Sequence, residues 1–141
     1  MGAGQTRSEL QAQAQAKLDD AILLLKHERY SNAYYIAGYA IEFGLKACIA
    51  VLIEAETIPN KAILKGIMSH QLMGLVALAG LGQTLKDELN NDPNFAANWA
   101  IVLEWEPDAR YQQIDPASAR LLISAIADSQ NGVLRWIRTH W

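Results

Sequence analysis

The residues best suited to chemistry lie together in one segment of the chain, residues 30–48. Four polar side chains there are spaced at intervals of four, three and four residues: Tyr35, Tyr39, Glu42 and Lys46. These intervals place all four on one face of a helix. Apolar residues fill the adjoining stripe, so the helix is expected to pack against the core. A carboxylate and an ammonium in such a place must either pair with each other or face a solvated cleft.

Both readings of that charge pair involve further residues. Glu42 precedes Lys46 by four residues, which is the favourable order for an ion pair on a helix. As a structural network, the pair is expected to include Arg110, with two tyrosines beside it. As a binding cleft, the same groups face a ligand, and His70 is either a polar anchor near a helix start or part of the cleft. The predicted ligand-binding residues are Tyr39, Glu42, Lys46, His70, Arg110 and Tyr111.

A second candidate site lies near the C-terminus, where Arg135 is followed five residues later by His140. Metal-independent RNA cleavage uses such a pair, because histidine can move a proton near neutral pH and arginine can stabilise charge on phosphate. On a continuous helix, however, the two side chains lie roughly 140° apart. The alternative reading is a solvated last turn whose cations complement the helix dipole.

Other chemistries find no support in the sequence. Three histidines and one cysteine are too widely spaced for a metal site, and no glycine-rich phosphate loop or nucleophilic serine turn is present. No cofactor is therefore predicted. Cys48 is expected to be a small buried residue. The net charge of −3 argues against broad, non-specific affinity for nucleic acid.

Two biases mark the second half of the chain. Residues 83–109 hold one lysine against six carboxylates, whereas residues 110–141 hold four arginines against two aspartates. The two segments are expected to pair within the fold or across a dimer.

The tryptophans also occur late in the chain, and three of them are expected in the core or at a dimer interface: Trp99, Trp105 and Trp136.

The elements that position these groups are all expected to be helices. No period-two alternation persists, and β-branched residues do not cluster. Capping residues and prolines divide the chain into helices over about residues 6–26, 31–56, 70–78, 94–105 and 117 to the end, with a short helix or ordered loop at 60–68 and a further helix start near 84. The helix starts are predicted by a capping box at residues 6–9, by the serines at 31 and 69, and by the Asp-Pro pairs at 92–93 and 115–116. Residues 1–5 are expected to be a loose end. The whole chain, 1–141, is predicted to be one all-α domain, a bundle of antiparallel helices.

Three landmarks, in order, carry a resemblance to a known family. The first is an alanine-rich pattern with a glutamate and a lysine: Ala33, Ala37, Ala40, Glu42, Leu45, Lys46 and Ala47. The second is a histidine with leucines, residues 70–75, and the third is Arg110–Tyr111 after an acidic, proline-containing loop. Together they resemble the HEPN domain family over residues 10–138.

The resemblance implies a four- to five-helix up-and-down antiparallel bundle that forms homodimers. It also implies a role in nucleotide or RNA biology. The residues themselves predict a cytoplasmic protein without a membrane segment, because the N-terminus is polar and the longest nearly uncharged apolar run, residues 72–81, is too short to span a bilayer. The function expected here is non-catalytic binding of nucleotide or RNA, or docking of a partner such as a nucleotidyltransferase. One alternative is an endoribonuclease toxin, paired with an antitoxin, that uses Arg135 and His140. A third reading is a structural or interaction scaffold.

Overall fold

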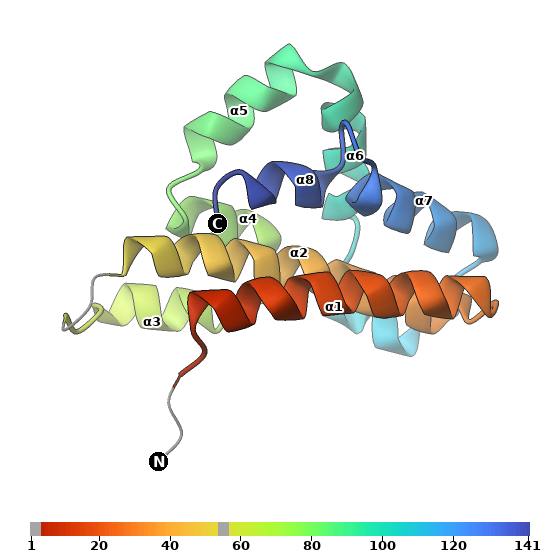
Figure 1. Cartoon of the computed structure of the whole chain (residues 1–141), viewed down its shortest axis with the longest axis horizontal. Helices are drawn as coiled ribbons and strands as arrows, with labels where there is room; N and C mark the ends of the chain where they lie inside the picture. The colour runs from red at the N-terminus through yellow and green to blue at the C-terminus, as the bar shows by residue number, and fades with distance from the viewer. Residues whose placement is uncertain (1–3, 54–56) are drawn as a thin grey trace.

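The computed structural model describes residues 4–53 and 57–141, and every regular element within them is helical (Figure 1). The predicted all-α class is thereby confirmed. The described residues form eight α-helices and one 3-10 helix, more elements than the four or five helices expected. They are α1 (Arg7–Lys26), α2 (Tyr30–Leu52), α3 (Lys61–Ile67), α4 (Leu72–Leu78), α5 (Gly82–Asn91), α6 (Pro93–Leu103), η1 (Pro107–Tyr111), α7 (Pro116–Ala127) and α8 (Val133–Arg138).

The two longest helices, α1 and α2, lie side by side and antiparallel (Figure 1). α1 begins with the predicted capping box, in which Thr6 and Glu9 each accept a hydrogen bond from the other's backbone N–H at 3.1 Å. Its inner face buries Leu10, Ala14, Leu18 and Ala21. Such a capped, amphipathic helix gives α2 a long surface to pack on.

α2 is the central element of the fold, because it packs against α1, α4, α7, α8 and η1. A Cβ atom at Gly38 would lie 2.0 Å from the ring of Trp105, so only glycine leaves room for the indole there. The helix has the length and hydropathy of a membrane span. However, 56% of the tested stretch is buried inside the fold, which is also what the core helix of a bundle shows.

Two serines expected to cap helices make other contacts. α2 begins at Tyr30, and the Ser31 hydroxyl accepts a hydrogen bond from the Ile114 backbone N–H at 2.9 Å. α4 begins two residues later than expected, because the Ser69 hydroxyl accepts from the Gln71 N–H at 3.0 Å in the turn before it. The predicted end of α2 near residue 56 lies outside the described residues.

The two Asp-Pro signals are confirmed as helix starts. Asp92 accepts hydrogen bonds from the N–H groups of Asn94 and Phe95 and caps α6. Asp115 accepts from the Ser118 N–H at 3.0 Å and caps α7. In both helices proline occupies the first turn, where its missing N–H removes no internal hydrogen bond.

The continuous last helix expected from residue 117 onward is wrong, because the chain turns between α7 and α8. The Asp128 carboxylate accepts hydrogen bonds from the N–H groups of Gln130 and Asn131 at 2.8 and 2.7 Å, which closes a tight turn. Gly132 then lies so close that a Cβ would be 2.3 Å from the Asp128 carbonyl oxygen. α8 therefore starts afresh and packs against α2, α6 and α7.

Candidate functional site

Glu42 is a buried carboxylate with a partner at each oxygen. Its side chain is only 2% exposed. Oε2 lies 3.1 Å from the Lys46 ammonium, and Oε1 lies 2.8 Å from Nδ1 of His70. The Lys46 side chain is 15% exposed, whereas that of His70 is 54% exposed. Since every charge in this cluster has a partner, Glu42 and Lys46 form an internal ion pair, and His70 is its outer, solvent-facing member.

The fold brings these three residues together from two elements. Glu42 and Lys46 lie one turn apart on α2, as their spacing predicts. His70 comes from the segment between α3 and α4 and reaches across to α2. The bond to Glu42 therefore fixes the orientation of the imidazole and ties that segment to the central helix.

Tyr39 joins this cluster to a group of aromatic side chains. Its ring lies 5.3 Å from Tyr35, 5.0 Å from Trp105 and 6.3 Å from His70, each with edge-to-face geometry. The hydroxyls of Tyr35 and Tyr39 are 3.5 Å apart. Burial, followed by the hydrogen bond to Tyr35, raises the pKa of Tyr39 to about 12, so its hydroxyl is protonated at neutral pH.

Arg110 and Tyr111 lie on η1 and do not join Glu42. The Arg110 guanidinium carbon is 4.6 Å from the centre of the Tyr111 ring, a cation–π contact. The Tyr111 hydroxyl, with a further contribution from Tyr35, raises the pKa of Arg110. No ion pair joins Arg110 to Glu42 in the described part of the chain, so the expected Arg110–Glu42 network is corrected: His70 occupies that place.

The predicted ligand-binding residues thus fall into two groups connected by Tyr39 and Tyr35. Glu42 and Lys46 face inward. The side chains that remain open to solvent are His70, Arg110 and Tyr111, with Tyr111 75% exposed. We call the partly or fully exposed surface of Tyr35, Tyr39, His70, Arg110 and Tyr111 the aromatic–cationic surface.

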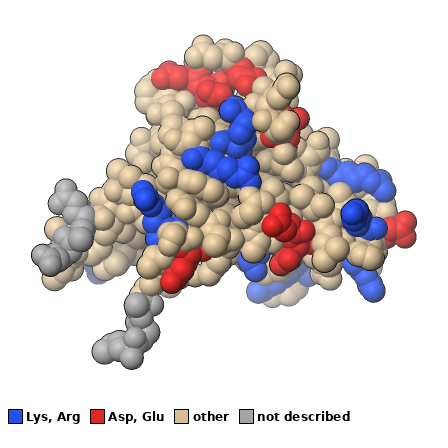
Figure 2. Space-filling model, viewed as in Figure 1, with Lys and Arg blue, Asp and Glu red and all other residues tan. Residues whose placement is uncertain are grey.

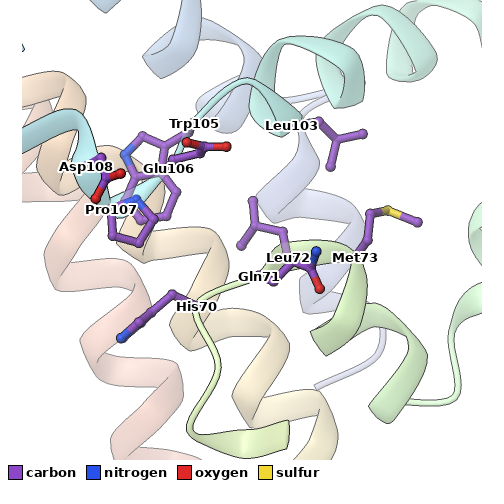
Figure 3. A pocket seen from close by; sticks show the side chains of 9 residues that line it. All are labelled: His70, Gln71, Leu72, Met73, Leu103, Trp105, Glu106, Pro107 and Asp108. Atoms are coloured by element: carbon purple, nitrogen blue, oxygen red, sulfur yellow. The ribbon is translucent and has the colours of Figure 1, made fainter.

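Next to this surface lies a cavity of about 620 Å³ that the sequence did not indicate. Figure 3 shows its two walls. Trp105, Glu106, Pro107 and Asp108 form one wall, and Leu72, Met73 and Leu103 form the other. The imidazole of His70 points away from the remaining lining residues, toward α2, in agreement with its bond to Glu42. No local pattern could indicate the cavity, because the acidic loop after Trp105 faces a wall made by residues of both α4 and α6.

The second candidate pair, Arg135 and His140, lies on and just after α8. Figure 2 shows basic side chains gathered over α8 and acidic ones over α5. Hydrogen bonds, chiefly from backbone N–H groups, lower the pKa of Asp92 and of Asp128. The positive charge of Arg135 makes a smaller contribution in the same direction. The Nε of Arg135 is nevertheless buried without a hydrogen-bond partner. No ion pair joins segments 83–109 and 110–141 in the described ranges, so their pairing, within the fold or across a dimer, stays a prediction.

His140 makes contacts of a different kind. Its ring lies 5.0 Å from that of Trp136, and burial lowers its pKa while Glu88 opposes the shift. No hydrogen bond or ion pair joins it to Arg135 in the described residues. Since α8 ends at Arg138, the final residues form a turn rather than a continuing helix.

The remaining chemistry-bearing residues have structural roles. Trp99, Trp105 and Trp136 are buried, so they belong to the core. Cys48 is buried too, and burial raises the pKa of its thiol to about 11, so it stays protonated and poorly reactive. In the described ranges, no group of three or more histidine, cysteine, aspartate or glutamate residues is arranged to hold a metal ion.

Comparison with protein-family models, with curated proteins and with solved structures finds no match to this chain.

Proposed function

We propose that this protein is a non-catalytic, HEPN-like binding protein that engages nucleotide or RNA through the aromatic–cationic surface. The observation that carries the proposal is the placement of Arg110 beside the largely exposed ring of Tyr111. Arginine is suited to phosphate oxygens, and an exposed aromatic ring stacks with a base of any sequence. His70 adds a hydrogen-bonding group, and Glu42 positions it.

The finer fold assignment belongs to the same proposal. α1 and α2 form an antiparallel pair, and α7 packs against both of them as well as against α6. We take these four helices as the up-and-down core of a HEPN-like bundle. The short helices α3, α4 and α5 then form a connection between α2 and α6, and α8 completes the last helix after its break.

The proposal includes a cytoplasmic homodimer that does not insert into a membrane. The buried position of α2 within the fold supports its assignment as a core helix. Exposed apolar side chains are available for self-association on α1 and α7: Ile22, Leu23 and Leu121. Sedimentation equilibrium tests this part, and a single species with the mass of one chain would reject it.

Binding is tested with a fluorescein-labelled octanucleotide of single-stranded RNA and, separately, with a fluorescent ATP analogue. Arg110→Ala is expected to weaken binding about tenfold, the effect of losing one charge-assisted contact to phosphate. Arg120→Ala is the matched control, because Arg120 lies 5.3 Å from the ring of Tyr30 in a second arginine–tyrosine pair. Equal affinity of both variants and the parent protein, or no binding of either probe, would reject the proposal.

The absence of catalysis is a separate part of the proposal. The positive charge of Arg135 contributes to the lowered pKa of Asp92 and Asp128, and His140 packs on Trp136, which supports structural roles for both. Purified protein is therefore expected to leave a labelled RNA intact over hours. Cleavage that disappears in His140→Ala would instead establish the ribonuclease alternative.

A further inference from the structure

The cavity between α4, the end of α6 and η1 differs chemically from the aromatic–cationic surface. One of its walls is largely aliphatic, formed by Leu72, Met73 and Leu103 with the amide of Gln71 beside them. The other places the Trp105 ring and Pro107 beside two exposed carboxylates, Glu106 and Asp108 (Figure 3). An occupant must therefore be apolar over much of its length and carry positive charge at one end.

The two carboxylates are open to such an occupant. Neither Glu106 nor Asp108 takes part in an ion pair or a side-chain hydrogen bond in the described part of the chain. By contrast, Glu42 has a partner at both oxygens. Carboxylates fixed at the edge of an apolar cavity attract a cation more strongly than carboxylates in open solvent, because the apolar wall lowers the local dielectric.

Two other classes of ligand fit the cavity poorly. Phosphate groups are repelled by the carboxylates, so the cavity is not an extension of the nucleotide site. A divalent metal ion needs more ligands than Glu106 and Asp108 supply, and no third histidine, cysteine or acidic residue joins them in the described chain. An organic cation remains.

We propose that this cavity binds an arginine or lysine side chain presented by a partner protein. The aliphatic part of that side chain lies between Trp105 and Leu72, and its charged end contacts Glu106 and Asp108. Arginine and lysine suit such a site because their apolar stems pack on hydrophobic surface while the charged end stays solvated.

A protein partner fits better than a small free amine. Met73 and Leu103 are 46% and 40% exposed, so the aliphatic wall continues to the outer surface, where residues flanking the cation can pack. The inference goes beyond the proposed function, and its peptide-binding test is made without nucleotide or RNA.

The test uses two short peptides and the full chain. The first is an acetylated, amidated pentapeptide with a central arginine between two leucines, labelled for fluorescence anisotropy. The second replaces arginine by citrulline, which has nearly the same shape but no charge. The arginine peptide is expected to bind at least about tenfold more tightly, since the charge-assisted contact is lost with citrulline.

Variants then locate the binding to the cavity. The double substitution Glu106→Gln with Asp108→Asn is expected to remove the preference for arginine over citrulline. The matched control, Asp19→Asn with Asp20→Asn, removes two exposed charges from α1 and is expected to keep it. Leu103→Trp fills the cavity without a change of charge and is expected to weaken both peptides.

Three outcomes would overturn the inference. One is equal affinity for the arginine and citrulline peptides. A second is an equal loss in the Asp19/Asp20 control, which would indicate attraction to net charge alone. The third is tight binding of free agmatine without measurable peptide binding, which would assign the cavity to a small amine. The Glu106/Asp108 variant is expected to bind the labelled RNA with the affinity of the parent protein. This result separates the test of the cavity from the test of the nucleotide site.

Discussion

The molecule contains two carboxylate sites that stand in opposite chemical situations, on either side of the Tyr39–Trp105 contact. At Glu42 the carboxylate is buried, and both oxygens are bound by side chains of the same fold. At Glu106 and Asp108 the carboxylates are exposed, have no side-chain partner among the described residues and line a largely apolar cavity. The comparison indicates that a carboxylate in a packed fold points to a binding site only where no side chain of the same fold is bound to it. The first site stabilises the fold, and the second is available for binding.

The largest expected effect comes from removing the buried carboxylate. Glu42→Ala leaves the Lys46 ammonium mostly buried without its counter-charge, so we expect a loss of about 3 kcal/mol in the free energy of unfolding. Urea denaturation followed by circular dichroism measures it. Glu106→Ala, at the unpaired site, is expected to change stability by less than about 0.5 kcal/mol. Equal losses at the two positions would contradict the comparison.

The next effect concerns the contact between the two sites. Gly38→Ala places a Cβ 2.0 Å from the Trp105 ring, so the indole must move, and we expect a loss of about 2 kcal/mol. Gly82→Ala is the matched control, because nothing lies within 4 Å of the added Cβ there. Thermal unfolding of both variants distinguishes a specific clash from a general effect of glycine replacement in a helix.

A smaller loss in the free energy of unfolding is expected for His70, the solvent-facing partner of Glu42. His70→Ala removes one hydrogen bond to Glu42 but exposes that carboxylate to water, so about 1 kcal/mol is expected. His27→Ala serves as control, because His27 is exposed in the turn after α1. An unchanged urea midpoint in His70→Ala would show that the 2.8 Å contact does not persist in solution.

The smallest effect is a pH dependence at His140. Burial lowers its pKa in the folded protein below the usual 6.5, so the unfolded chain binds the proton first as the pH falls. Its contribution to stability is therefore complete above about pH 6.5 and declines as the pH falls below that value. We expect the urea midpoint to drop slightly less between about pH 7.5 and 5.5 in His140→Gln than in the parent protein. A larger drop of the urea midpoint in the variant than in the parent protein would contradict the prediction.

The sequence predicted those parts of the fold that depend on local chemistry. The capping box at Thr6 and the Asp-Pro pairs at Asp92 and Asp115 set helix starts through bonds within three residues, and all three are confirmed. The break before α8 was missed although Asn131–Gly132 is itself a turn signal. The apolar pattern runs through both α7 and α8, and it outweighed that signal in the prediction of one long helix.

The candidate site was only partly predictable for a related reason. The pairing of Glu42 with Lys46 follows from their spacing on one helix. The bond from His70 to Glu42 and the cavity wall around Trp105 join segments far apart in sequence, which no local pattern reveals. Arginine at position 110 was the obvious candidate for the second partner of Glu42, whereas the fold supplies a histidine that needs no charge to donate a hydrogen bond.

The close seating of Trp105 on Gly38 has a consequence for communication between the two sites. The indole forms a wall of the cavity, and its ring lies 5.0 Å from Tyr39, which in turn contacts His70. Because the indole lies directly against Gly38, the ring cannot shift toward α2 without moving that helix. A ligand in the cavity and a ligand on the aromatic–cationic surface would then be energetically coupled. By thermodynamic linkage, each would change the affinity of the other by the same factor.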